Sequence, residues 1–338
     1  MNVETGFDLT NYNGLKIAAN AKRLAAVTSL EQLKEILGTI DSSEPVHILG
    51  AGTNTVWGAS FINKTVLKME IPSFEVLDED KESVLVKIGA GENWDGCVAR
   101  SVALDLSGIE ALSGIPGTVG AGPIQNIGAY GQEIGQCLET VTIFDRNINQ
   151  TKILDKSACR LTYRDSIFKH EAKKLIITNI ILRLSKRESS VPNYPDVIAH
   201  FENRKIPSPN LQEIREAVLG IRAKKLPDPK VIPNCGSFFK NPIVGLDKAL
   251  ELKEKFPDMP QYPFENKTKI PAGWLIDSLG MKGQRFGGIE IYKNNALVLT
   301  APESNAVIED VLTARDQIIK QVVSVFGITL EIEPMIVT

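Results

Sequence analysis

Apolar and polar residues follow one another along this chain in short blocks that predict both strands and helices. Apolar or alternating runs bounded by turn residues predict strands at residues 46–49, 65–69, 84–88, 140–144 and 175–184. Apolar residues at three- and four-residue spacing, with capping residues, predict helices at residues 29–37, 94–104, 211–224, 246–256 and 306–326. The strands come in groups with helices between them, so the pattern indicates an α+β fold.

The last nine residues, LEIEPMIVT, predict a terminal strand that pairs with a sheet near a functional site. A period of two places Glu331 and Glu333 on one face and Leu330 and Ile332 on the other. Two interpretations stay open. The carboxylates are either the solvated face of an edge strand or include a general acid whose pKa is raised in a closed site.

Two proline-containing stretches interrupt the pattern, residues 189–209 with four prolines and the segment LPDPK at residues 226–230. We predict a domain boundary between them. A chain of 338 residues is long enough for two or three domains.

Composition narrows the function classes. A formal net charge of −3 and a pI of about 5.8 give no electrostatic case for nucleic-acid binding. No signal peptide and no apolar run of membrane-spanning length is present, so we expect a cytoplasmic protein. The four cysteines form no C-x-x-C pair and no histidine lies near them, which predicts reduced, buried thiols and no metal site.

The most specific chemical signal is the segment GIPGTVGAGPIQNIGAYG at residues 114–131, in which six of eighteen residues are Gly and Tyr130 alone is ionisable. A shorter segment, GAGTNT at residues 50–55, follows a predicted strand. Successive N–H groups in such turns hold anions without Lys or Arg, so both loops predict a phosphate-bearing cofactor. Neither matches the G-x-G-x-x-G or Walker pattern. The alternative is that the glycines only form tight turns.

Two further polar islands could carry chemistry. Arg164, in YRDS at residues 163–166, could hold a carboxylate through its planar fork or form a structural pair with Asp165. Ser237, in GSFFKNP at residues 236–242, is either a proton donor in an apolar pocket or a turn residue. The absence of G-x-S-x-G argues against a hydrolase.

Taken in order, these motifs resemble the UDP-N-acetylenolpyruvoylglucosamine reductase family. The motifs are GxGTN, the long glycine loop, YRDSIFK, KLPDP, GSFFKNP, AGWLID…KG…GG and LEIEP, and they cover the chain from about residue 15 to its end. The intact Tyr163 motif and the segment around Tyr194 resemble the longer-loop subtype, which has an extra substrate-covering loop.

The resemblance implies an FAD-binding domain of the vanillyl-alcohol-oxidase (PCMH) type in two subdomains, plus a separate α+β substrate-binding domain. The implied division is residues 1–70 with 329–338, residues 71–212 and residues 213–328. It also implies a monomer in the cytoplasm that contributes to peptidoglycan synthesis, and so to cell shape and division.

The implied reaction is the NADPH-dependent reduction of the enolpyruvyl group of UDP-N-acetylglucosamine enolpyruvate to the lactyl ether of UDP-N-acetylmuramate. Non-covalent FAD would pass hydride from N5, and Ser237 would supply the proton. Arg164 is the matching cation and Glu333 the matching acid or hydrogen-bond partner.

Other site residues carry over from the family motifs by position. The implied cofactor contacts are Gly50, Gly52, Thr53, Asn54, Thr55, Gly114, Ile115, Pro116, Gly117, Gly120, Asn126, Gly128, Ala129 and Arg164. The implied substrate contacts are Tyr130, Tyr194, Arg222, Lys225, Asn241, Lys282 and Asn295. Pro334 departs from the usual aliphatic residue, and since Pro lacks an N–H, the terminal strand is expected to pair differently there.

Two competing functions remain. A flavin oxidase or dehydrogenase of the same superfamily would often tether FAD through His or Cys, yet His47 alone lies near the glycine loops. A catalytically inactive binding protein would not need Arg164, Ser237 and Glu333 together.

Overall fold

In a computed structural model of the chain, the structure describes residues 4–41, 43–171, 174–187 and 190–338. Residue 189 of the predicted proline-containing stretch therefore lies outside the described residues. The chain forms two compact units. The first comprises Met1–Phe7, Ala21–Ala51 and Asn63–Lys224, and the second comprises Asp8–Asn20, Gly52–Ile62 and Lys225–Thr338. The three-part division implied by the resemblance stays a prediction.

A four-stranded sheet carries the N-terminal part of the first unit. Its strand order is β1 (Glu4–Asp8), β2 (Asn20–Val27), β5 (Phe61–Met69) and β3 (Val46–Leu49), with β3 parallel to β5. Helix α1 (Leu30–Thr39) begins after Ser29, whose side chain accepts a hydrogen bond from the N–H of Gln32. Leu33 and Ile36 of α1 pack with Ala25 and Leu67 of the sheet.

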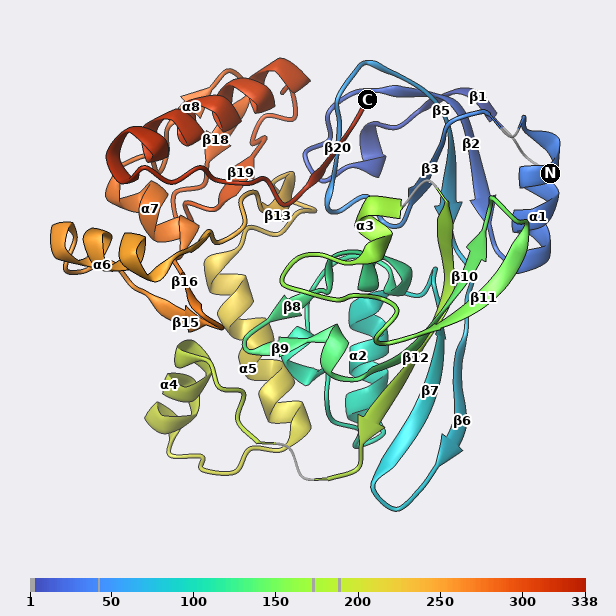
Figure 1. The fold of residues 1–338 in the computed structure, drawn as a ribbon, viewed down its shortest axis with the longest axis horizontal. Coiled ribbons are helices and arrows are strands. Elements are labelled where there is room, and N and C mark those ends of the chain that lie inside the picture. Colours follow the sequence, from blue (N-terminus) through green and yellow to red (C-terminus); the bar gives the residue numbers. More distant parts are fainter. Residues whose placement is uncertain (1–3, 42, 172–173, 188–189) are drawn as a thin grey trace. The chain divides into compact units, whose positions relative to one another are not determined.

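A second, antiparallel sheet forms the larger core of this unit (Figure 1). The strand order is β11 (Gln150–Asp155), β10 (Leu138–Asp145), β12 (Leu175–Ser185), β7 (Ser83–Gly89) and β6 (Phe74–Glu79). The central strands are buried on one face, where α2 (Trp94–Ala103) contributes Trp94 and Val98 to their core. The edge strands β6 and β11 are largely exposed and carry charged residues, which blunts them against further pairing.

The segment between α2 and β10 has little regular structure. Short 3-10 turns, η2 (Glu110–Leu112), η3 (Val119–Ala121), η4 (Pro123–Gln125) and η5 (Ile134–Gln136), enclose a hairpin of β8 (Gly128–Ala129) and β9 (Gln132–Glu133). The unit is completed by α3 (Ile167–Glu171), α4 (Pro195–Arg204) and α5 (Leu211–Lys225). Helices α4 and α5 share a small separate core of Val197, Phe201, Ile214 and Val218.

The second unit combines small sheets with three helices. Its sheets are β13 (Asn234–Ser237), β19 (Val298–Thr300), β18 (Ile289–Ile291) and β17 (Arg285–Phe286); β14 (Ile243–Val244), β16 (Lys267–Lys269) and β15 (Tyr262–Phe264); and the parallel pair β4 (Thr55–Trp57) and β20 (Met335–Val337). Helices α6 (Leu246–Lys255), α7 (Ala272–Ser278) and α8 (Ile308–Phe326) surround one core. Val311, Ile318 and Phe326 of α8 are among its buried residues.

The predicted helices and strands are confirmed, with small differences at their ends. The terminal strand is a correction, because β20 spans only Met335–Val337. Ile332 instead forms an isolated antiparallel bridge with Phe239. The N–H of Glu333 donates to the carbonyl of Phe238 at 2.9 Å, whereas the N–H of Met335 donates to the carbonyl of Asn54 at 2.9 Å. The chain thus changes pairing partner at Pro334, the one position between them that has no N–H to donate.

Candidate functional site

Within the first unit, Gly50 at the start of the short glycine loop lies against the long loop. A Cβ on Gly50 would stand 2.5 Å from Oγ1 of Thr118, so this approach requires a glycine. In the first unit the described residues supply no acceptor for the N–H groups of Ala51, Gly117 and Thr118, and in the second unit they supply none for that of Gly52. Unpaired main-chain N–H groups are suited to hold an anion, so each loop fits a phosphate of a nucleotide cofactor.

Residues 90–95 hold the long loop from behind. The N–H of Gly120 donates to the carbonyl of Ala90 at 2.9 Å, and the N–H of Trp94 donates to the carbonyl of Gly117 at 3.1 Å. The N–H of Gly114, at φ +72°, donates to Oδ1 of Asp95 at 2.6 Å. Ile115 and Pro116 lie between these contacts. Residues 90–95 therefore satisfy main-chain groups of Gly114, Gly117 and Gly120. The N–H groups of Gly117 and Thr118 stay available for a ligand.

Asn126 is held in a different way from the rest of the predicted cofactor contacts. It is buried at φ +47°, and its amide nitrogen donates to Oε2 of Glu133 at 2.7 Å and to the carbonyl of Thr162 at 3.2 Å. Its amide oxygen accepts from the N–H of Gly135 at 3.0 Å. These bonds tie the loop to the turn that carries Arg164.

Arg164 lies in a tight two-residue turn, since the N–H and carbonyl of Thr162 exchange hydrogen bonds with those of Asp165. Its φ of +55° is left-handed, which costs a non-glycine residue about 1–2 kcal/mol. Nη2 of Arg164 donates to the carbonyl of Gly128 at 2.8 Å, beside Ala129. Of the two interpretations left open for Arg164, a structural pair with Asp165 is not found, because Asp165 pairs with Nε2 of His170 at 2.9 Å. Backbone strain held by surrounding contacts is typical of functional positions.

Tyr130 occupies the tip of the β8–β9 hairpin. Tyr130 and Gly131, at φ +50° and +85°, form the left-handed pair that such two-residue hairpins require. The Tyr130 ring meets the Tyr194 ring edge to face, with centroids 5.1 Å apart. The charge of Arg222 acts on Tyr130, and burial lowers the pKa of this guanidinium. Burial raises the pKa of Tyr130, so the phenol stays protonated and able to donate.

Ser237 and Glu333 lie close together within the second unit. The N–H of Glu333 bonds to Phe238, the residue after Ser237. Nδ2 of Asn54, in the short glycine loop, donates to the carbonyl of Glu333 at 3.4 Å. Ser237 is half-buried at the end of β13, and its hydroxyl has no hydrogen-bond partner among the described residues. Within the second unit, hydrogen bonds thus join three separate segments that carry a predicted proton donor, a predicted acid and part of a predicted cofactor loop.

The other predicted cofactor contacts of the short loop are Gly52, Thr53 and Thr55, next to Asn54 in the sequence. Thr53 is half-buried, and Thr55 is buried where β4 begins. A Cβ on Gly52, at φ +73°, would stand 2.2 Å from the carbonyl oxygen of Tyr12, so this position too requires a glycine.

The other predicted substrate residues all have protein contacts. Oδ1 of Asn241 accepts from the N–H of Ala272 at the start of α7, at 2.9 Å. Nζ of Lys282 lies 2.6 Å from Oδ2 of Asp277. Oδ1 of Asn295 accepts from the N–H of Leu297 at 3.0 Å. Lys225 is exposed at the end of α5. The contacts of Asn241, Lys282 and Asn295 fix the orientation of their side chains.

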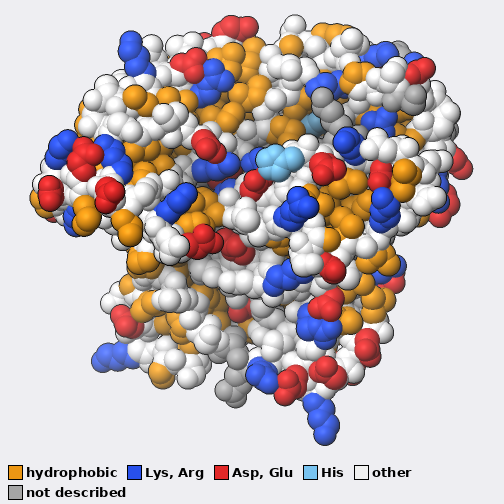
Figure 2. Space-filling view, viewed as in Figure 1, with side chains coloured by type: hydrophobic (Ala, Val, Ile, Leu, Met, Phe, Trp, Pro, Cys, Tyr) orange, Lys and Arg blue, Asp and Glu red, His pale blue; other side chains and the backbone are white. Residues whose placement is uncertain are grey.

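The four cysteines are free and buried, as predicted. Burial raises the pKa of Cys97, Cys137 and Cys235 to about 12 and that of Cys159 to about 11, so all four stay thiols. Among the described residues no cluster of His, Cys, Asp and Glu could hold a metal ion. No helix in the described part of the chain is long and apolar enough to cross a membrane. Charges of both signs are interspersed on the visible face (Figure 2).

Residues 21–147 match the family described as "FAD binding domain", and residues 228–337 match "UDP-N-acetylenolpyruvoylglucosamine reductase, C-terminal domain". Together with the glycine loops, the first match places the protein among the FAD-dependent oxidoreductases and confirms the predicted fold class.

Two relatives and a solved structure show which family the chain belongs to. The chain is 39% identical to the UDP-N-acetylenolpyruvoylglucosamine reductase of Flavobacterium johnsoniae, over 98% of this chain and 99% of the relative. It is also 39% identical to that of Dechloromonas aromatica, over 99% of both chains. The fold matches the crystal structure of the reductase from Thermus caldophilus, with a TM-score of 0.70 and 22% identity over the whole of both chains. The chain belongs to the UDP-N-acetylenolpyruvoylglucosamine reductase family.

Sequence reasoning missed Asp95 and Arg215. Oδ1 and Oδ2 of Asp95 lie 2.6 and 2.8 Å from Nη1 and Nη2 of Arg215, in a two-point pair. A signal was present in the sequence, because positions 215, 219 and 222 recur at the spacing of one helix face. That face meets the long glycine loop.

Proposed function

We propose that the protein reduces the enolpyruvyl group of UDP-N-acetylglucosamine enolpyruvate to the lactyl ether of UDP-N-acetylmuramate, with NADPH as reductant. Family membership over the full chain supports this reaction. The observation that carries the proposal is the joining of Asn54, Glu333 and the Ser237–Phe238 segment by main-chain and side-chain hydrogen bonds. A cofactor loop, a carboxylic acid and a hydroxyl are the groups that this reduction requires.

The glycine loops hold the FAD. Held there, FAD would supply the hydride chemistry that connects NADPH with the vinyl carbon of the substrate. Ala51, Gly117 and Thr118 of the first unit would offer their N–H groups to its diphosphate. Neither glycine loop contains His or Cys, so we expect the cofactor to be held without a covalent bond.

Ser237 supplies the proton. Addition of hydride to the substrate leaves an enolate conjugated with a carboxylate, and this carbanion is basic enough to take a proton from a serine hydroxyl. The Ser237 hydroxyl has no acceptor among the described residues that would compete for its proton. The residue after Ser237 bonds to Leu297 and Glu333, which fixes the backbone beneath the hydroxyl. General acids placed in this way typically contribute about 10²–10⁴ in rate.

Arg164 and Glu333 stabilise the charge that develops on the enolate. The guanidinium of Arg164 is oriented by its bond to the carbonyl of Gly128 and by the tight turn, so it is preorganised to bind an anion. Glu333 is the matching acid or hydrogen-bond partner for the same developing charge. Preorganised donors of this kind contribute about 10²–10³ each.

The sugar nucleotide is bound by residues from several elements. Tyr130, Tyr194 and Arg222 form one contacting group, in which Arg222 offers charge to the diphosphate and the tyrosines offer phenol groups. Lys225 and Lys282 add positive charge, and Asn241 and Asn295 add amide groups. We propose that the product serves peptidoglycan precursor synthesis, and hence cell shape and division, in the cytoplasm, and that the enzyme acts as a monomer.

A turnover experiment tests this function. Purified protein is incubated with NADPH and the enolpyruvyl sugar nucleotide, and the product is analysed by mass spectrometry. We expect a product heavier by two hydrogens and one NADPH oxidised for each product formed. NADPH oxidation that depends on oxygen and leaves the sugar nucleotide unchanged would show an oxidase instead.

A further inference from the structure

Asp95 contacts both the long glycine loop and α5. Oδ1 of Asp95 accepts from the N–H of Gly114 at 2.6 Å, and the two carboxylate oxygens pair with Arg215 at 2.6 and 2.8 Å. The side chain of Arg215 is only 12% exposed, so solvent screens the pair less than a surface pair. The Arg215 guanidinium holds the pKa of Asp95 below its usual value, which keeps the carboxylate charged.

The same face of α5 continues to Arg222. A Cβ on Gly114 would stand 2.8 Å from Cδ2 of Leu219 and 3.1 Å from Nε of Arg222. Residues 215, 219 and 222 follow the i, i+4, i+7 spacing of one helix face. The glycine that begins the cofactor loop is therefore enclosed by α5, and the Asp95–Arg215 pair fixes the register between them.

We propose that Asp95 and Arg215 are positioning residues that hold the long glycine loop and Arg222 in one arrangement, so that cofactor and sugar-nucleotide binding are coupled. This inference rests on the proposed function for the second ligand only. Asp95 accepts the N–H of Gly114 in the loop. Arg215 lies on the same face of α5 as Arg222, whose charge acts on Tyr130. Neither residue needs to touch a ligand.

The test compares D95N, R215M and the double variant. D95N keeps an acceptor for the Gly114 N–H but removes the charge pair. We measure the Kd of FAD for the apoprotein by quenching of flavin fluorescence, and KM and kcat for the sugar nucleotide. Both Kd and KM should rise about five- to a hundredfold, the usual range of coupling between sites, while kcat changes little. The second substitution should add little to the first.

The chain offers a matched control. Arg183 and Glu139 form a comparable two-point pair in the same unit, at 3.0 and 3.1 Å, but join β12 to β10. E139Q should leave Kd and KM unchanged. Unchanged Kd and KM in soluble, folded D95N would overturn the proposal, and R215K provides a milder variant if D95N does not fold. If wild-type protein binds FAD but does not use the sugar nucleotide, the proposed function fails while the FAD measurement still decides the role of Asp95.

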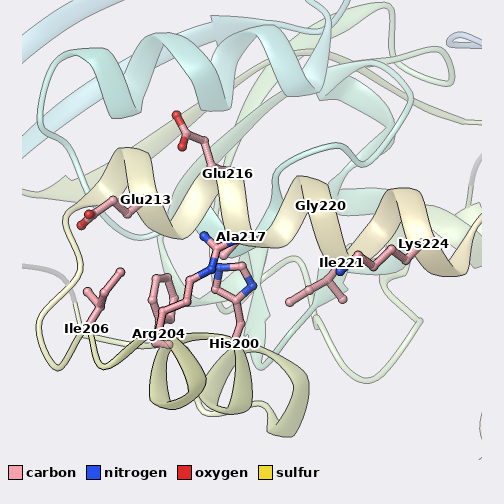
Figure 3. Close-up of a pocket in the computed structure, with 10 residues that line it drawn as sticks. His200, Arg204, Ile206, Glu213, Glu216, Ala217, Gly220, Ile221 and Lys224 are labelled. Carbon is pink, nitrogen blue, oxygen red and sulfur yellow. The ribbon is translucent and has the colours of Figure 1, made fainter.

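A different observation carries a second inference. A cavity of about 430 Å³ lies between α4 and α5, and His200, Arg204 and Lys224 line it (Figure 3). Within the described chain these three side chains have no ion pair and no hydrogen bond. Two carboxylates also line the cavity, and each accepts a hydrogen bond from a neutral donor. Glu213 accepts from the N–H of Asn210 at 2.8 Å, and Glu216 accepts from the side-chain amide of Gln212 at 2.8 Å. A Cβ on Gly220 would meet nothing, so the floor is open.

We infer that this cavity binds a phosphate group, supplied by inorganic phosphate or by a small phosphate monoester. Figure 3 shows His200 and Arg204 side by side, pointing toward α5 near Ala217. Burial, and then the charges of Arg204 and Lys224, lower the pKa of His200, so a bound dianion would relieve repulsion among the three groups. The volume suits a small ligand.

Histidine NMR tests this inference directly, since the chain has three histidines. Titration with inorganic phosphate should move the midpoint of His200 upward by about one pH unit and leave His170, paired with Asp165, unmoved. The R204M/K224M variant should lose the response, whereas the control K293M should keep it. A tighter response to a nucleoside monophosphate than to inorganic phosphate would identify a monoester as the ligand. No movement of His200 in wild-type protein at saturating phosphate would overturn the inference.

Discussion

The two units hold their predicted site residues by different means. In the first unit Tyr130 and Arg164 occupy left-handed turns, and each side chain is oriented by protein contacts, Tyr130 by Tyr194 and Arg222 and Arg164 by Gly128. In the second unit Ser237 and Glu333 lie on short extended segments joined through Phe238. Strain fixes the groups that bind charge, whereas backbone pairing places the groups that handle the proton. We therefore expect substitutions in the two units to differ in their effects on turnover, on the single half-reactions and on the free energy of unfolding.

Ser237→Ala should have the largest effect and should separate the two half-reactions. We expect reoxidation of reduced flavin by the sugar nucleotide to slow by about 10²–10⁴, because the proton donor is lost. Reduction by NADPH needs no proton from Ser237 and should stay near the wild-type rate. Rapid-mixing absorbance at the flavin band measures both steps, and S324A on α8 is the control. Equal slowing of both steps would make Ser237 a structural residue.

Arg164→Gly tests the role of strain in the first unit. Turnover should fall by about 10²–10³ because the preorganised cation is lost. Stability should change by less than about 1 kcal/mol, since relief of the left-handed strain offsets the lost hydrogen bond to Gly128. Denaturant unfolding and steady-state assays measure the two quantities.

Arg160 gives the matched control for that substitution. It too is left-handed, at φ +47°, but exposed. Arg160→Gly should stabilise the protein slightly without loss of turnover. A variant of Arg164 that loses stability by several kcal/mol and keeps its activity would show that the turn is purely structural.

Pro334→Ala should have the smallest effect and sharpens the description of the second unit. The native partner change at Pro334 needs no N–H, so replacement adds a donor and increases the entropy of the unfolded chain. We expect a loss of about 0.4–1 kcal/mol in unfolding free energy with little change in kcat. A large fall in kcat without loss of stability would mean that Pro334 itself aims Glu333.

Periodicity predicts α1, α5, α8 and the central strands, because these helices bury one face and these strands alternate. It missed β2, α4 and α7, and α4 lies inside the proline-containing stretch predicted to interrupt the pattern. It failed at the C-terminus, where two carboxylates alternate with apolar residues but the backbone changes partner at a proline. The partners of single groups were also beyond the sequence. Asp165 pairs with His170 and not Arg164, and Asp95 pairs with an arginine 120 residues later, because such pairs depend on how α2 and α5 approach the glycine loop.

The most direct test of the account is an anaerobic flavin titration of the wild-type protein. The visible spectrum is recorded on purified protein, after NADPH, and after addition of the enolpyruvyl sugar nucleotide. We predict a flavin band that bleaches with NADPH and returns on addition of that substrate alone. A bound flavin that bleaches but ignores the sugar nucleotide would contradict the proposed reaction, and protein that binds no flavin would contradict the assignment of the glycine loops.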